Sequence, residues 1–242
     1  MPYKFSPSSL SLLIDCPRCF WLAFNEGIKR PEGIFPTLPS GMDRILKEHF
    51  DRFMMYGRLP PELGQLEGVK LFNNKELLDE WRNNRKGIRW KDGHENTLMG
   101  AVDNLLQKGD KLIVLDYKTR GYPPKEDTHS HYQHQMDIYN FLLRKNGFAT
   151  EEYSYLLFYH PDKVTPTGEV IFHKQLVKVP TDPKRAEELF ERALEVLGKE
   201  CPEANGCSWC KNIFSKSDVI NENPMKKLWD NKKDDKIWGK YV

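Results

Sequence analysis

Three charged side chains interrupt a largely apolar stretch between Gly100 and Gly121. Asp103, Asp116 and Lys118 stand among apolar residues in the segment GAVDNLLQKGDKLIVLDYKTRG. A charge on a mostly buried sheet is costly unless it is paired or bound to a metal ion. The three residues therefore indicate either a cluster of ion pairs or a hydrolytic metal site.

A β-hairpin is the element predicted to carry these charges. Apolar runs at 98–106 and 111–117 flank the tripeptide Lys-Gly-Asp at 108–110, which is typical of a glycine turn. Side chains alternate between the two faces of a strand, so Asp116 and Lys118 share one face while Tyr117 points to the other. Asp103 is expected to reach the same neighbourhood from the partner strand.

Helical and strand patterns surround the hairpin on both sides. Helices are predicted at 7–21, 40–56, 74–84, 128–145 and 183–199, and further strands at 88–91, 153–160 and 170–179. This order of elements predicts an α/β fold with a mixed β-sheet flanked by helices. We expect one domain over 1–242, with a helical N-terminal segment at 1–36, a core at 37–200, and a cysteine-bearing segment with a Lys-rich tail at 201–242.

The amino-acid composition limits the kinds of partner and the cellular compartment that we expect for this chain. The 242 residues include 37 basic and 35 acidic ones, a formal net charge of +2, so any nucleic-acid surface must be local. No apolar run is long enough for a membrane span, and no export signal begins the chain, so we expect no membrane partner and a cytoplasmic protein.

Four of the five cysteines form two C-x2-C pairs. Cys16 and Cys19 stand near the N-terminus, Cys207 and Cys210 stand far along the chain, and Cys201 is a spare. Each pair can supply two thiolates to one tetrahedral metal site. The alternative is five buried thiols without a ligand.

A run of basic residues lies between two tryptophans. Positive charge beside aromatic faces suits a nucleic-acid track, while a solvated basic surface is the plain alternative. The candidate nucleic-acid-binding residues are Arg82, Arg85, Lys86, Arg89, Lys91 and Trp90.

The order GAVD, DYK and QMDIY resembles the PD-(D/E)XK nuclease superfamily, in particular its RecB-like and CRISPR-associated exonuclease branch. The resemblance implies a restriction-endonuclease-like core in which Asp103, Asp116 and the Tyr117 carbonyl bind Mg²⁺ or Mn²⁺. It also implies that Lys118 assists the attacking water. Gln135 and Tyr139 match the Q-x3-Y motif of that branch and complete the candidate catalytic set.

Two features depart from the family pattern. Related nucleases often carry a metal-binding histidine four residues after a glycine, but Ile45 follows Gly41 at that spacing. His49 or Glu48 could replace that ligand, and His49 is the candidate carried forward. A structural histidine is the alternative. In the same branch the cysteines bind a 4Fe-4S cluster. Here no cysteine follows Cys210, so the fourth ligand is Cys19 or Cys201, and sequence leaves iron-sulfur and Zn²⁺ open.

Taken together, these features predict a metal-dependent DNA nuclease, acting as an exonuclease on single-stranded ends. A phosphodiester resists hydrolysis unless divalent charge offsets its own and a water is held in line, and hard carboxylate oxygens suit Mg²⁺ or Mn²⁺. The alternatives are a non-catalytic nucleic-acid-binding module with a structural cysteine-metal site, and a zinc-stapled interaction subunit.

Overall fold

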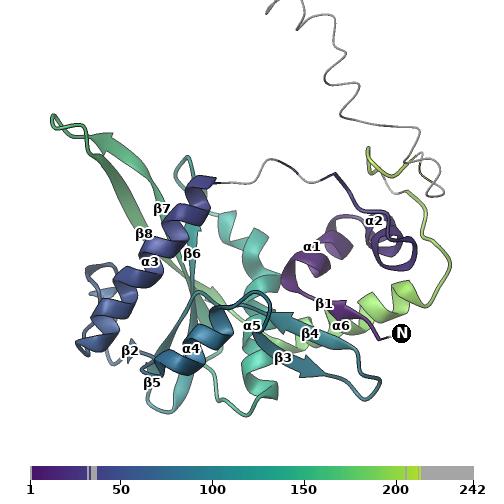
Figure 1. Cartoon of the computed structure of the whole chain (residues 1–242), viewed down its shortest axis with the longest axis horizontal. Coiled ribbons are helices and arrows are strands. Elements are labelled where there is room, and N and C mark those ends of the chain that lie inside the picture. The colour runs from purple at the N-terminus through teal and green to yellow at the C-terminus, as the bar shows by residue number, and fades with distance from the viewer. Residues whose placement is uncertain (1, 32, 34–36, 205, 212, 214–242) are drawn as a thin grey trace, which may run out of the picture. The chain divides into compact units, whose positions relative to one another are not determined.

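The structure is a computed structural model that describes residues 2–31, 33, 37–204, 206–211 and 213 (Figure 1). Its internal contacts divide the chain into two compact units. The first comprises 1–11 and 33–194, and the second comprises 12–32 and 195–242. The predicted Lys-rich tail falls at 214–242 and lies outside the described residues.

A five-stranded mixed sheet forms the centre of the first unit. Its strand order is β2-β5-β6-β7-β8, in which β6 and β7 are parallel and the other neighbours are antiparallel. The strands are β2 (Lys70–Leu71), β5 (Asn104–Lys108), β6 (Lys111–Thr119), β7 (Tyr153–Val164) and β8 (Val170–Pro180). The predicted mixed sheet and the β5–β6 hairpin are confirmed.

A second, three-stranded sheet has the order β1-β4-β3, with β1 (Lys4–Phe5), β3 (Ile88–Lys91) and β4 (Thr97–Gly100). The prediction of one strand over 98–106 is wrong. That run forms β4 and β5, which belong to different sheets, and Asp103 lies in the connection between them. Both strands are buried, so an unbroken apolar run conceals the point at which the chain changes sheet.

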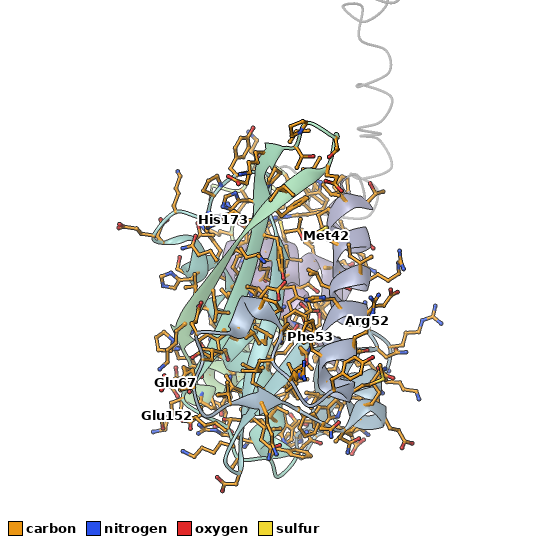
Figure 2. All side chains as sticks on the ribbon, turned by 90° about the vertical axis from the view of Figure 1, so that its left-hand side faces the viewer. Met42, Arg52, Phe53, Glu67, Glu152 and His173 are labelled. Atoms are coloured by element: carbon orange, nitrogen blue, oxygen red, sulfur yellow. The ribbon has the colours of Figure 1, made fainter. Side chains whose placement is uncertain are left out.

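Two helices cover opposite faces of the five-stranded sheet. The ring of Phe50 on α3 (Thr37–Met55) lies 4.9 Å from the Tyr117 ring, on one face of β6. On the other face, α5 (Gln133–Lys145) brings Gln135 against Asp116. Figure 2 shows Met42, Arg52 and Phe53 along α3.

The remaining helices differ from prediction mainly at their ends. They are α4 (Lys75–Arg82), α6 (Pro183–Leu197) and α1 (Pro7–Asp15). A 3-10 turn, η3 (Thr128–Tyr132), precedes α5, so the helix predicted from 128 begins five residues later. Helix α3 begins at Thr37, before the predicted cap at Ser40, because Pro39 is tolerated in a first helical turn.

The second unit begins with a broken helix. The single predicted helix over 7–21 is wrong, because α1 ends at Asp15 and α2 (Pro17–Trp21) starts after Cys16. Cys16 is extended, with φ −158° and ψ 103°, since a residue before proline avoids the helical region. A π-helical segment, η1 (Leu22–Glu26), follows. Leu22, Ile28 and Ile213 pack with the cysteines in a small apolar cluster.

None of the helices in the described part of the chain is long and apolar enough to cross a bilayer.

Close packing explains the glycine of GAVD. A Cβ on Gly100 would lie 2.7 Å from Cε1 of Tyr139, whose ring is buried. We predict that Gly100→Ala lowers stability by about 1–3 kcal/mol, because overpacking displaces that ring. In contrast, Gly41→Ala on α3 meets nothing within 4 Å and should be neutral or stabilising. Urea denaturation measures the free energy of unfolding of both variants. An unchanged free energy of unfolding in Gly100→Ala would contradict the packing argument.

Candidate active site and cysteine centre

A buried ion pair on β6 forms the centre of the candidate active site. Asp116 and Lys118 point to the same face, as strand alternation predicts, and their carboxylate and ammonium groups form an ion pair. The Asp116 side chain is only 2% exposed and that of Lys118 17%. Tyr117 points to the opposite face, where its hydroxyl accepts a hydrogen bond of 2.8 Å from Asn104.

Gln135 on α5 joins this pair to Tyr139. Its Nε2 donates to Asp116 Oδ1 at 3.3 Å and to the Tyr139 hydroxyl at 2.8 Å. Its Oε1 accepts a hydrogen bond of 3.1 Å from Lys118 Nζ. Residues four apart share one face of a helix, so the Q-x3-Y spacing aims both side chains at the strand. The Tyr132 ring also lies 4.7 Å from Lys118 Nζ.

Asp103 reaches the site from the β4–β5 connection. Its Oδ2 accepts a hydrogen bond of 2.9 Å from the Tyr117 backbone N–H. The Asp103 carbonyl accepts a 2.7 Å hydrogen bond from Nε of Arg82, and Arg82 also pairs with Asp51 at 2.8 Å. The end of α4 therefore fixes the connection that presents Asp103.

Two charged residues of α3 stand beside Asp103, and sequence reasoning missed both. Lys47 Nζ lies 2.8 Å from Asp43 Oδ2 and 3.3 Å from Asp103 Oδ1. Burial and the nearby Asp103 raise the pKa of Asp43 despite Lys47. The available signal was an oppositely charged pair at i and i+4 on the helix before the hairpin, a pattern that is also common on exposed helix surfaces.

Burial controls the titration of the paired charges. It raises the pKa of Asp116 to about 7, since the opposing effect of Lys118 is partly cancelled by Asp103. For Lys118, burial disfavours the charged form, but Asp116 and Asp103 outweigh it and raise the pKa. The site therefore holds its ammonium charged and leaves one carboxyl close to its midpoint at neutral pH.

The donor set fits a divalent cation. Asp116 Oδ2 is buried without a hydrogen bond of acceptable geometry in the described part of the chain, although Lys118 Nζ lies against it. Asp43 and Asp103 bring two further carboxylates from different elements. Carboxylate oxygens are the ligands preferred by Mg²⁺ and Mn²⁺. Asp103 and Asp116, with Asp43 beside them, are thus the residues that could hold such an ion.

His49 makes its contacts elsewhere. Its Nε2 lies 3.3 Å from Glu62 Oε2, and its ring packs against Phe50 and Phe53. Glu62 in turn accepts a hydrogen bond of 3.4 Å from the Tyr159 hydroxyl. Among the described residues, the polar partner that the structure records for His49 is therefore Glu62 and not Asp103 or Asp116.

The predicted nucleic-acid track is only partly a surface. Arg82 is buried in its pair with Asp51 and does not belong to the track, and the Trp90 ring packs edge-on at 5.0 Å from Phe141. Arg82 pairs with Asp51 because a buried guanidinium without a partner is costly. Trp90 uses its ring for packing against other aromatic side chains. The remaining residues of the track are exposed: Arg85, Lys86, Arg89 and Lys91.

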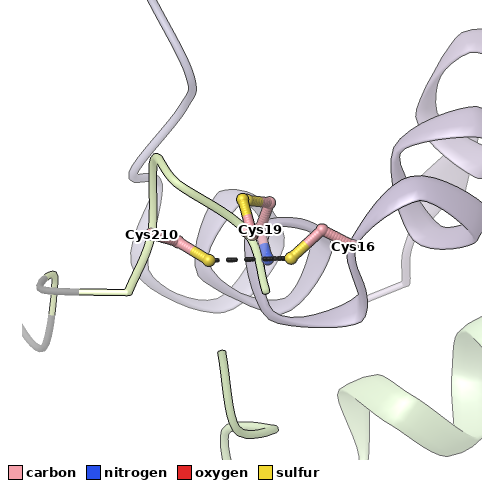
Figure 3. A group of neighbouring side chains, drawn as sticks. Cys16, Cys19 and Cys210 are labelled. Atoms are coloured by element: carbon pink, nitrogen blue, oxygen red, sulfur yellow. Dashed lines mark hydrogen bonds between the residues drawn. The ribbon is translucent and has the colours of Figure 1, made fainter. Parts of the chain in front are cut away.

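Four cysteines converge within the second unit. Their sulfur atoms all lie within 4.8 Å of one another, and no other His, Cys, Asp or Glu group of three or more in the described residues is as compact. The Sγ atoms of Cys16 and Cys210 are 3.6 Å apart (Figure 3). Those of Cys19 and Cys207 are 3.5 Å apart. Cys201 is half-buried and lies outside the group. Of the two candidates for the fourth position, the structure therefore brings Cys19 to the other three cysteines. The four thiols could bind a metal.

Arginine and backbone donors surround the sulfurs. Arg30 donates to Cys19 Sγ at 3.2 Å and to Cys207 Sγ at 3.5 Å. Burial raises the pKa of Cys19 to about 11. At Cys207 burial acts in the same direction, but the N–H groups of Cys210 and Trp209 outweigh it and lower the pKa to about 6. At least one thiolate is therefore available at neutral pH.

Comparison with known proteins gives one finding. The family model described as the PD-(D/E)XK nuclease superfamily matches residues 43–213, which is more than two thirds of the chain. The matched range contains the carboxylates, Lys118, Gln135 and Tyr139. A search of the curated proteins gives no match.

The raised pKa of Asp116 makes metal binding pH-dependent. Below about pH 7 a cation must displace a proton from this carboxyl, at a cost of up to tenfold in affinity per pH unit. Without metal, ionising a group whose folded pKa is raised destabilises the fold as the pH rises from 3.8 through about 7. We therefore predict that Mn²⁺ raises the melting temperature more at pH 8 than at pH 6.

Asp116→Asn should abolish this Mn²⁺ effect at both pH values. Asp110→Asn, on the exposed β5–β6 turn, is the matched control and should retain it. An equal Mn²⁺ shift in Asp116→Asn and in the control would show that the ion binds elsewhere.

Proposed function

This chain belongs to the PD-(D/E)XK nuclease superfamily, and from that premise we propose that it is an Mg²⁺- or Mn²⁺-dependent exodeoxyribonuclease acting on single-stranded ends. Membership of the superfamily implies metal-dependent nuclease activity. The observation that carries the proposal is the meeting of Asp103, Asp116 and Lys118 at one point of β6, with Gln135 bridging the last two.

Each of these side chains has a distinct task in phosphodiester hydrolysis. Asp103 and Asp116, with the Tyr117 carbonyl and Asp43 nearby, would hold the ion, which when bound supplies positive charge to the phosphate and acidifies a water. The ammonium of Lys118 can orient water and stabilise charge that develops on the phosphate oxygens. Gln135 holds that ammonium and the Asp116 carboxylate in a fixed relative position, which avoids reorganisation during the reaction.

DNA ends are the substrate that the other features favour. The motif order and the CPR context of Cys16 resemble the RecB-like exonuclease branch. The exposed Arg85, Lys86, Arg89 and Lys91 can contact successive phosphates without base specificity. A non-catalytic module would not need three carboxylates, those of Asp43, Asp103 and Asp116, gathered around two ammonium groups.

At the cysteine centre we propose one Zn²⁺ ion. Four thiolates at about 2.3 Å from one zinc place their sulfurs ~3.8 Å apart. In a 4Fe-4S cluster each thiolate binds a different iron, which separates the sulfurs by roughly 6 Å. The observed pairs at 3.5 and 3.6 Å fit the mononuclear site. The wider spacing expected for the cluster that the resemblance implies is the reason for preferring zinc in this proposal.

The nuclease proposal predicts a sharp loss of activity at two positions. Lys118→Ala and Asp116→Asn should each reduce cleavage by at least about 100-fold, since the first removes an ammonium that acts at the phosphate and the second removes a carboxylate that would hold the ion. Labelled single- and double-stranded DNA with Mg²⁺ or Mn²⁺, and the same reactions with EDTA, are the assay. Lys108→Ala, an exposed lysine on the β5–β6 turn, is the control and should cleave normally.

Full DNA binding by the wild-type chain without metal-dependent cleavage would favour the non-catalytic alternative and reject the nuclease. Cleavage of circular single-stranded DNA, which has no ends, would reject the exonuclease assignment but not the nuclease.

The zinc proposal predicts about one zinc per chain and no absorption near 400 nm in protein purified without oxygen. Cys207→Ser should lose the metal and lower the melting temperature, whereas Cys201→Ser should retain it, because Cys201 stands outside the ligand group. Replacement by Co²⁺ should produce the intense visible bands of a tetrahedral thiolate site. About four irons with equal sulfide per chain would overturn the assignment.

A further inference from the structure

A pocket of about 580 Å³ opens beside the candidate active site within the first unit. Its walls are formed by β1, the start of α1, Asn84, the end of β4 and α5. The lining residues that the argument uses are Lys4, Ser6, Ser8, Asn84, Gln135 and Tyr139. A volume of this size lies in the range of sites for small organic ligands.

The chemistry of the lining suits a nucleotide. Lys4 is exposed and forms no ion pair within the described part of the chain, so its ammonium is available to an anion. The hydroxyl group of Ser8 and the amide group of Asn84 can donate and accept hydrogen bonds, and Met99 adds apolar surface. No aspartate or glutamate is among the described residues of the lining, which favours an anionic occupant.

Gln135 connects the pocket directly to the reacting groups. It lines the pocket and also bonds to Asp116 and Lys118. Tyr139, the other wall residue from α5, is 4% exposed, and its hydroxyl accepts from Gln135, so its own proton remains available for an acceptor. A ligand in the pocket would therefore lie one side chain away from the carboxylate and the ammonium.

One lining residue of the pocket, Asn84, is adjacent in sequence to exposed basic residues. Asn84 immediately precedes Arg85 and Lys86, whose backbone N–H groups are held by Asn83 Oδ1 at 2.8 and 3.1 Å. The loop after α4 thus places phosphate-binding charge next to the pocket. The pocket thus has Asn84, next to these basic residues, and Gln135, which bonds to Asp116, among its lining residues.

We propose that this pocket binds the nucleotide adjoining the scissile phosphodiester, with its phosphate at Lys4 and Ser8 and its base against Asn84 and Met99. The role of the pocket in cleavage rests on the proposed nuclease function. Nucleotide binding in the pocket does not depend on cleavage. It makes Lys4 and Asn84 residues that position the substrate strand.

Titration of the full-length chain with thymidine 5′-monophosphate, without added divalent metal, tests the site. The wild-type chain should bind the nucleotide, and Lys4→Glu should weaken binding by about tenfold through loss of a charge-assisted contact. Ser8→Trp should reduce it further by filling the pocket. Lys108→Glu makes the same charge change on the distant β5–β6 turn and should bind as the wild type does.

In cleavage assays Lys4→Glu should raise KM while kcat changes by less than about twofold, as expected for a group that only binds substrate. Nucleotide binding that responds to these variants in a chain that cleaves no DNA would uphold the pocket and reject the nuclease. Equal binding by Lys4→Glu, Ser8→Trp and Lys108→Glu, or no binding by the wild type, would overturn the pocket whether or not the chain cleaves DNA.

Discussion

Burial of the Asp116–Lys118 ion pair inside the five-stranded sheet is the constraint on which the site depends. Removing two charges from water costs several kcal/mol per ion, and the pair alone repays this only when further hydrogen bonds satisfy the remaining atoms. Gln135 supplies two of these bonds from α5. Tyr139 then holds Gln135, and the Tyr139 ring leaves no room for a Cβ on residue 100. One buried pair thus determines residue types on two strands and a helix.

The same region is arranged for charge rather than for stability. Asp43 and Asp103 share the single ammonium of Lys47, and the buried Asp116 carboxylate is paired with the ammonium of Lys118. When all three carboxylates are ionised they exceed the two ammonium groups by one negative charge, which favours the binding of a cation. A fold selected for stability alone would replace such a cluster with apolar side chains at little cost, so its presence argues for a binding role.

Short-range patterns made part of this arrangement predictable. Strand alternation placed Asp116 and Lys118 together and Tyr117 opposite, because the period of two holds for any extended chain. The sheet change between β4 and β5, and the approach of Lys47 to Asp103, depend on tertiary packing across 56 positions of sequence, which no local pattern encodes. Arg82 was misjudged for the same reason, since its partner Asp51 lies on another helix.

The cysteine centre applies a different kind of constraint. Cys19 and Cys207 are 188 positions apart, and the two segments that carry the ligands flank in sequence the chain that forms most of the first unit. A metal that ties these segments reduces the freedom of the unfolded chain, with a benefit that grows only slowly with loop length. Pro17 contributes locally, because it keeps Cys16 extended and lets its sulfur accept from the Cys19 N–H. The candidate active site shares no residue with this centre. We therefore expect loss of a metal from the cysteines to lower the stability of the fold and to leave the carboxylates of the candidate active site in place.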